Sequence, residues 1–184
     1  KRIGLLGGTF NPPHLGHLIM AEQVCSQLGL DRVEFMPDFI PPHVDTKSAI
    51  EAKHRVAMVK LAVEDNPNFG VELAEINRGG KSYSYDTLIA LKRAHPENQY
   101  YFIIGADMVA YLPKWYRIAD LAKMVQFVGV KRPGVKVHSA YPILWVDTPT
   151  IDLSSTLIRH KIAKRHSIRY LVPQQVCEYI REHK

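Results

Sequence analysis

The 184-residue chain has only two cysteines, Cys25 and Cys177, and they lie far apart in the sequence. This number and spacing provide no disulfide framework and match no zinc-binding pattern. Long apolar runs are also missing, because no run approaches the length of a membrane-spanning helix and nothing resembles a signal peptide. We therefore expect a cytoplasmic protein with no membrane contact.

Runs of charge of one sign are scarce as well. Lys and Arg outnumber Asp and Glu by 24 to 18, for a formal net charge of +6, yet no Lys/Arg run is longer than two residues. The missing basic runs disfavour a nucleic acid as partner, and the positive balance favours small polyanions. The basic excess is concentrated late, because residues 157–184 hold seven Lys/Arg against two Glu.

The chain shows no internal repeat, low-complexity tract or linker, and its length fits one domain over residues 1–184. Segments of strand type alternate with segments of helical type almost throughout. This alternation predicts an α/β fold with a Rossmann-like, doubly wound, mainly parallel sheet and helices on both faces. The expected strands are 2–6, 32–36, 71–76, 100–104, 125–130 and 143–146. The expected helices are 15–28, 49–64, one capped by Ser84 or Asp86, 118–124, 157–163 and 173–181, with a helical C-terminal part from about residue 153.

The segment Gly7–His17, GGTFNPPHLGH, connects the first expected strand to the first expected helix. It has neither the G-x-G-x-x-G spacing of dinucleotide-binding folds nor the Gly-Lys-Ser/Thr end of a Walker A loop. Its paired glycines let the backbone approach a ligand, and the following helix N-terminus attracts an anion, which is most often phosphate. His14 and His17 lie on one side of the helical turn. On these residues alone, an ordinary turn and a metal-binding or surface histidine pair remain alternatives.

The segment Leu153–Arg159, LSSTLIR, is a second phosphate-binding candidate. Its three hydroxyl side chains stand at a helix start, and Arg159 falls about one turn later. The alternative is an ordinary serine N-cap with an exposed arginine. Two such helix N-termini together fit a triphosphate. In addition, Asp107 follows the buried strand 100–104 and suits ribose hydroxyls or a metal.

These motifs lead to a known family. Gly7–His17 resembles the (T/H)xGH signature of the nucleotidyltransferase superfamily, and Leu153–Arg159 resembles its ISSTxIR signature. Across essentially the whole chain, further segments resemble bacterial nicotinate-nucleotide adenylyltransferases: IPPH at 40–43, SYDT at 84–87, IGAD at 104–107, PKWY at 113–116 and VKRPG at 130–134. The resemblance implies an enzyme that joins ATP and nicotinate mononucleotide (NaMN) to give deamido-NAD and pyrophosphate. It implies Mg²⁺ with ATP as substrate and no covalent intermediate.

The resemblance also implies residue roles. His14, His17 and Arg159 would be catalytic. ATP would contact Gly7, Gly8, Thr9, Phe10, His14, His17, Gly105, Asp107, Ser155, Thr156 and Arg159. NaMN would contact Gly8, Thr9, Phe10, Thr87, Trp115, Tyr116 and Arg132. Among these, Thr87 and Tyr116 would offer backbone N–H groups to the nicotinate carboxylate, and Trp115 would stack on the pyridine ring. No residue is implied as a metal ligand.

Some features depart from this pattern or have a simpler explanation. Position 11 is Asn where many relatives carry Asp, and Val44 stands where close relatives often have Lys, a cation that Lys47 would have to replace. For Trp115 the alternative to ring stacking is a packed core residue. The rival functions are adenylyl transfer to nicotinamide mononucleotide or phosphopantetheine, non-catalytic nucleotide binding and, on net charge alone, nucleic-acid binding. The sequence leaves a homo-oligomer open.

Overall fold

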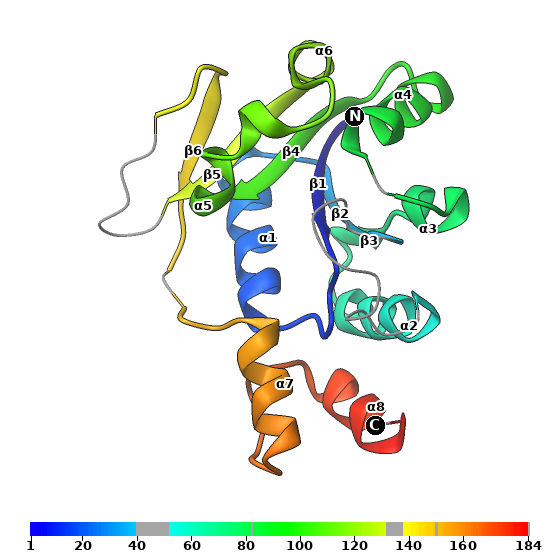
Figure 1. Ribbon diagram of the computed structural model, residues 1–184, viewed down its shortest axis with the longest axis vertical. Coiled ribbons are helices and arrows are strands. Elements are labelled where there is room, and N and C mark those ends of the chain that lie inside the picture. Colours follow the sequence, from blue (N-terminus) through cyan, green and yellow to red (C-terminus); the bar gives the residue numbers. More distant parts are fainter. Residues whose placement is uncertain (40–51, 82, 132–137, 150, 184) are drawn as a thin grey trace.

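The computed structural model describes residues 1–39, 52–81, 83–131, 138–149 and 151–183. These residues form one sheet of six strands in the order β3-β2-β1-β4-β5-β6, and every pair is parallel (Figure 1). The strands are β1 Arg2–Gly8, β2 Arg32–Pro37, β3 Phe69–Val71, β4 Gln99–Gly105, β5 Val125–Lys131 and β6 Ile143–Asp147. Strand order reverses between β1 and β4, and ligands of such sheets bind beyond the carboxyl ends of the strands at this point.

Helices cover both faces of the sheet. On one face, α1 (Leu15–Leu28) and α2 (Ala52–Val63) pack their apolar residues against β1 and β2. On the other face, α4 (Ser84–Ala94), α5 (Ala106–Val109), the 3₁₀ helix η2 (Leu112–Lys114) and α6 (Ile118–Met124) close a second core around β4 and β5. The predicted doubly wound α/β fold is therefore confirmed.

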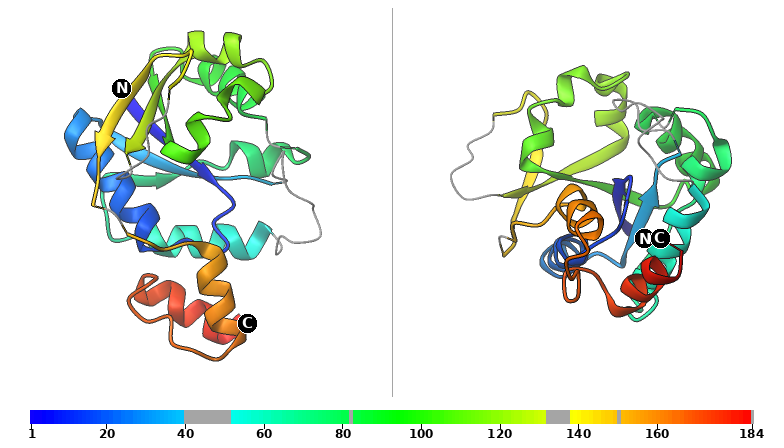
Figure 2. Two further views of the ribbon diagram at one scale, coloured as in Figure 1. Left: turned by 60° about the vertical axis from the view of Figure 1, so that its left-hand side comes forward. Right: turned by 60° about the horizontal axis from the view of Figure 1, so that its bottom comes forward.

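The C-terminal helices α7 (Ser155–Ala163) and α8 (Gln174–His183) form a third cluster of buried residues. Met58 of α2 packs there with Ile158 of α7 and Val176 of α8. Figure 1 shows α7 and α8 below the carboxyl end of β1, and both views in Figure 2 keep α8 beside α2. The second motif is thereby carried to the same edge of the sheet as the first.

Most expected elements form close to their predicted bounds. Helix α1 has the predicted bounds, and Gly29 ends it in the left-handed conformation at φ 60°. The prediction of a strand over 71–76 is wrong, because β3 ends at Val71 and α3 (Ala74–Arg78) follows. The Glu72 carboxylate accepts from the Ala74 N–H at 3.1 Å and stabilises the start of this short helix. The N-cap of α4 is Tyr83, with no side-chain cap, so the N-cap prediction for Ser84 and Asp86 is also wrong.

Helix length also bears on the membrane prediction. None of the helices in the described ranges is both long and apolar enough to cross a bilayer.

Candidate nucleotide site

The two histidines of the first motif are held by the backbone at the start of α1. His14 is the N-cap residue, and its Nδ1 accepts a hydrogen bond from the Gly16 N–H at 3.1 Å. The His14 N–H in turn donates to Nδ1 of His17 at 3.0 Å, and the two rings stack with centroids 3.8 Å apart. Because a backbone N–H can only donate, each Nδ1 is an acceptor. The neutral ring must then carry its proton on Nε2.

Burial keeps both imidazoles neutral. It lowers the pKa of His14 from 6.5 to about 4, and it lowers the pKa of His17 to about 3, with the neighbouring His14 as a second cause. At neutral pH the pair therefore presents two Nε2–H donors and no net charge. Donors of this kind suit phosphate oxygens. Among the described residues, no group of three or more His, Cys, Asp and Glu side chains is arranged to hold a metal, so the metal-pair alternative finds no support there.

Two neighbouring residues explain the sequence around this pair. A Cβ on Gly16 would lie 2.8 Å from Cε1 of His14, so only glycine leaves room for the ring. Phe10 is buried and left-handed at φ 52°, and its ring meets the His17 ring edge-on with centroids 4.9 Å apart. Non-glycine residues in this conformation cluster at functional sites, where the surrounding structure enforces them.

The second motif binds directly to the first. The Ser155 hydroxyl donates to the Pro12 carbonyl at 2.8 Å, and the Arg159 guanidinium donates to the Asn11 carbonyl at 2.7 Å and to Thr156 Oγ1 at 3.2 Å. Ser154 caps α7 by accepting from the Leu157 N–H at 3.1 Å. The serine N-cap alternative is thus correct for Ser154. Arg159 is exposed as that alternative required, yet it is also fixed against the loop that leads to His14.

The end of β4 lies at the same edge of the sheet. The register pairs Leu6 with Ile103, so Gly8 and Gly105 end neighbouring strands side by side. A Cβ on Gly105 would meet no atom within 4 Å, which shows open space over the backbone. Asp107 is exposed in the first turn of α5. The residues predicted for ATP therefore converge on the strand-order reversal from three separate segments.

Two of the residues predicted for NaMN, Thr87 and Tyr116, lie at the start of α4, and the predicted role of Thr87 needs a correction. The Thr87 N–H donates to the Tyr83 carbonyl at 3.2 Å, so this N–H is already used inside the helix. Thr87 is fully buried, and its hydroxyl donates to Glu75 Oε2 at 2.7 Å. The N–H groups without an intrahelical acceptor are those of the first turn, residues 84–86. Tyr116 is exposed and lies over this turn, with its ring 5.0 Å from the Tyr83 ring.

Trp115 packs against aromatic residues of the core, as expected for the alternative in which it is a core residue. Its ring meets Phe102 and Phe127 edge-on, with centroids 5.6 and 6.2 Å away. Its Nε1 is buried and has no hydrogen-bond partner within the described part of the chain. An indole N–H that is buried without a partner destabilises this position of the side chain, because buried polar groups are normally hydrogen-bonded. Stacking on a pyridine ring stays a prediction.

Several predicted residues lie outside the described ranges. These are Arg132, predicted to contact NaMN, together with the segment 40–43, Val44 and Lys47.

No sequence motif indicates the buried arginine on α2. The Arg55 side chain is 1% exposed and donates to the carbonyls of Thr9, Asp38 and Phe39 at 3.0, 2.7 and 3.1 Å. It also forms an ion pair of 3.2 Å with the Asp38 carboxylate, whose other oxygen accepts from the Thr9 hydroxyl at 3.3 Å. One cation thus joins the loops that follow β1 and β2. A single arginine in an otherwise ordinary helical pattern is indistinguishable from a solvent-facing residue.

Comparison with known proteins agrees with this geometry. A model of the cytidylyltransferase-like family matches residues 5–161, which defines a nucleotidyltransferase. The chain is 62% identical over 183 residues to a protein of Lactiplantibacillus plantarum named "Probable nicotinate-nucleotide adenylyltransferase". The match covers 100% of this chain and 87% of that protein. An Enterococcus faecalis protein of the same name is 58% identical, with 99% and 83% covered. The chain therefore belongs to the cytidylyltransferase-like nucleotidyltransferases and, within them, to the nicotinate-nucleotide adenylyltransferases.

A solved structure supports the fold. The nicotinic acid mononucleotide adenylyltransferase of Plasmodium falciparum, complexed with NaAD, superposes with a TM-score of 0.82 at 18% identity. The match covers 100% of this chain and 96% of that one. At this identity the likeness establishes the shared α/β architecture.

Proposed function

We infer that the protein transfers the adenylyl group of ATP to NaMN and releases deamido-NAD and pyrophosphate. The observation that carries this inference is the direct contact between the two motifs, in which Ser155 and Arg159 bind the loop carbonyls just before His14. This contact joins the start of α7 to the loop that leads to the two imidazoles, and the loop follows β1, which borders the strand-order reversal. Relatives that share more than half of this sequence carry the name of this activity.

We propose that positioning and electrostatics perform the transfer. The NaMN phosphate is already an anion and attacks the α-phosphorus of ATP, while the bond to pyrophosphate breaks. The Nε2–H groups of His14 and His17 would donate to the oxygens on which negative charge builds. Such donors are effective because they are preorganised and shielded from water. The backbone hydrogen bonds to both Nδ1 atoms supply this preorganisation.

The leaving group would be held by the second motif. Ser155, Thr156 and Arg159 would take the β- and γ-phosphates at the start of α7, where helix N–H groups and a guanidinium favour anions. Arg159 uses two of its five N–H donors on Asn11 and Thr156, so donors remain for phosphate. Gly7 to Phe10 and Gly105 would allow the nucleotides close to the backbone. Asp107 would bind a ribose.

The acceptor pocket would lie between α4 and the segment 115–116. The first turn of α4 offers its N–H groups and dipole to a carboxylate, which favours nicotinate over its neutral amide. Tyr116 would close this pocket over Tyr83. Trp115 would rotate out of its packed position, where its N–H has no partner, and stack on the pyridine ring.

We propose that Mg²⁺ enters with ATP as the MgATP complex. A hard cation of this kind is held by phosphate oxygens and water more readily than by the imidazole donors found here.

Initial rates decide between the acceptors. Deamido-NAD formation from ATP and NaMN should exceed dinucleotide formation from nicotinamide mononucleotide at equal concentrations, with phosphopantetheine inert. A faster reaction with the amide, or with phosphopantetheine, would sink the assignment of substrate. Nucleotide binding without pyrophosphate release from any acceptor would instead show a binding protein.

A further inference from the structure

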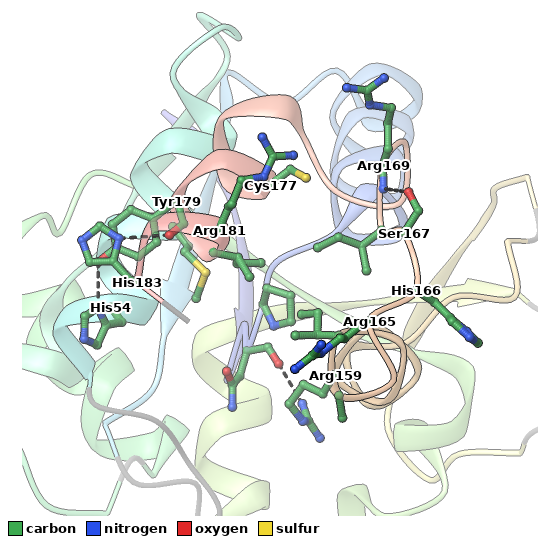
Figure 3. A pocket seen from close by; sticks show the side chains of 17 residues that line it. His54, Arg159, Arg165, His166, Ser167, Arg169, Cys177, Tyr179, Arg181 and His183 are labelled. Atoms are coloured by element: carbon green, nitrogen blue, oxygen red, sulfur yellow. Dashed lines mark hydrogen bonds between the residues drawn. The ribbon is translucent and has the colours of Figure 1, made fainter.

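A cavity of about 930 Å³ lies beside α7, next to the proposed nucleotide site (Figure 3). Its buried apolar floor includes Met58, Ile168 and Cys177, and the segment 165–169 and helix α8 form its walls. Neither histidine of the first motif contributes to the lining, and Arg159 is the one proposed catalytic residue that does. The volume is in the range of small-molecule sites, about 300–1,000 Å³.

Positive charge surrounds this floor without a counterion. The lining includes four arginines and three histidines but no Asp or Glu. Within the described ranges, the guanidinium groups of Arg165, Arg169 and Arg181 have no ion-pair or hydrogen-bond partner. In Figure 3 Arg165 points across the cavity, whereas Arg169 and His166 point away from it. Unpaired cations beside an apolar surface favour an anion with an apolar body.

Arg165 occupies a backbone position that favours glycine. It has φ +59° directly after the C-cap Lys164. Its N–H donates to the Ile162 carbonyl at 3.0 Å, and the His166 N–H donates to the Lys161 carbonyl at 2.8 Å. These two bonds are those of a Schellman motif, in which glycine normally takes the left-handed position because a Cβ is unfavourable there. The backbone conformation alone therefore gives no reason for an arginine at this position.

Rigid aromatic groups complete one wall. Tyr179 and His183 stack with ring centroids 4.0 Å apart, and the Tyr179 hydroxyl is 2.8 Å from Nδ1 of His54. All three residues line the cavity. A flat aromatic body beside these rings, with phosphate oxygens on guanidinium groups, is how proteins recognise nucleotides.

We propose that this cavity is a second nucleotide site, separate from the one that carries out adenylyl transfer. A nucleotide phosphate is bound by Arg165, which crosses the cavity, and the base lies on the apolar floor beside Tyr179 and His183. The proposal does not depend on the proposed catalytic activity, because no residue assigned to the reaction except Arg159 borders the cavity.

Equilibrium dialysis with radiolabelled ADP tests it, using Arg165→Gly. Glycine removes the cation but suits the backbone, so this variant should melt about 2 °C higher while one ADP per chain is bound at least about tenfold more weakly. Its rate of deamido-NAD formation should be unchanged. The wild type should bind two ADP per chain, or one if the catalytic site does not take ADP.

Tyr170→Gly is the matched control. Tyr170 also stands at positive φ, 71°, and is 80% exposed, but it does not line the cavity. Its replacement should raise the melting temperature similarly and leave ADP binding intact. The proposal is overturned if Arg165→Gly binds as much ADP, with the same affinity, as the wild type and Tyr170→Gly.

Discussion

Replacing Arg55 tests how far the site depends on a residue that contacts no predicted ligand. In Arg55→Met the apolar stem remains but the guanidinium is lost, which removes the cation paired with the Asp38 carboxylate and the hydrogen bonds that Arg55 donates to the carbonyls of Thr9 and Phe39. Removing one partner of a buried ion pair destabilises a protein by about 3–5 kcal/mol. For a chain of this length, that lowers the melting temperature by roughly 10 °C. Because total stabilities are about 5–15 kcal/mol, the variant should still fold.

The effect on catalysis should exceed what lost stability explains. Without Arg55, the Thr9 carbonyl and the segment 38–39 are released from one another, and Thr9 lies between the paired glycines and Phe10. We expect kcat/KM to fall at least tenfold for both substrates at 20 °C, well below the melting temperature. Pyrophosphate release gives kcat and KM, and calorimetry gives the melting temperature. Arg55→Lys, which keeps the charge, should recover part of both.

Two further variants sharpen this test. Arg55→Met combined with Asp38→Asn leaves no unpaired buried charge, so its unfolding free energy should exceed the value expected from the two single changes. Arg93→Met removes an exposed arginine from α4 and should change neither property. A wild-type melting temperature and a wild-type kcat/KM in Arg55→Met would show that Arg55 does not hold the two loops together.

Further predictions concern the histidine pair, the acceptor pocket and the metal. Burial lowers the pKa of His14 to about 4 and of His17 to about 3, below the ordinary 6.5. Their contribution to stability is therefore complete above pH 6.5 and is lost as the pH falls towards 3. The urea midpoint of unfolding should fall as the pH is lowered over this range, and a midpoint that rises would contradict this prediction. Gly16→Ala places a methyl group 2.8 Å from the His14 ring and should destabilise the fold by about 1–3 kcal/mol, with a lower kcat; wild-type values of both would show that the ring is not confined. Trp115→Leu should raise the KM for NaMN more than the KM for ATP, and an equal rise in both would place the indole outside the acceptor pocket. EDTA should stop turnover and excess Mg²⁺ restore it, whereas full activity in EDTA would exclude MgATP as the substrate.

The sequence predicted the elements that have strong local signals. Alternating segments specified the parallel sheet, and Gly29 marked the end of α1. The two motifs were predicted to cooperate, and they meet because the third core cluster brings α7 to the carboxyl end of β1. Short elements were less predictable. The apolar residues at 71–76 were expected to form a strand, yet a helix begins at Ala74, whose N–H donates to the Glu72 side chain.

Tertiary contacts account for what the sequence did not reveal. Arg55 belongs to the site only because α2 packs beside the loops after β1 and β2, and no local sequence pattern indicates this tertiary contact. Thr87 matched a family motif, but its N–H is used inside α4, so the motif indicates the pocket without giving the donor. The left-handed conformation of Arg165 could not be predicted either, because glycine is the residue that normally indicates it.

In the proposed mechanism, the neutral imidazole pair stabilises the charge that builds at the α-phosphate. The most direct test is a single-turnover measurement of deamido-NAD formation by His17→Ala, with saturating ATP and NaMN. We expect a rate constant lower by about 10²–10³, as for the loss of one preorganised donor, with folding and ATP binding retained. Equal rate constants for the variant and the wild type would contradict it.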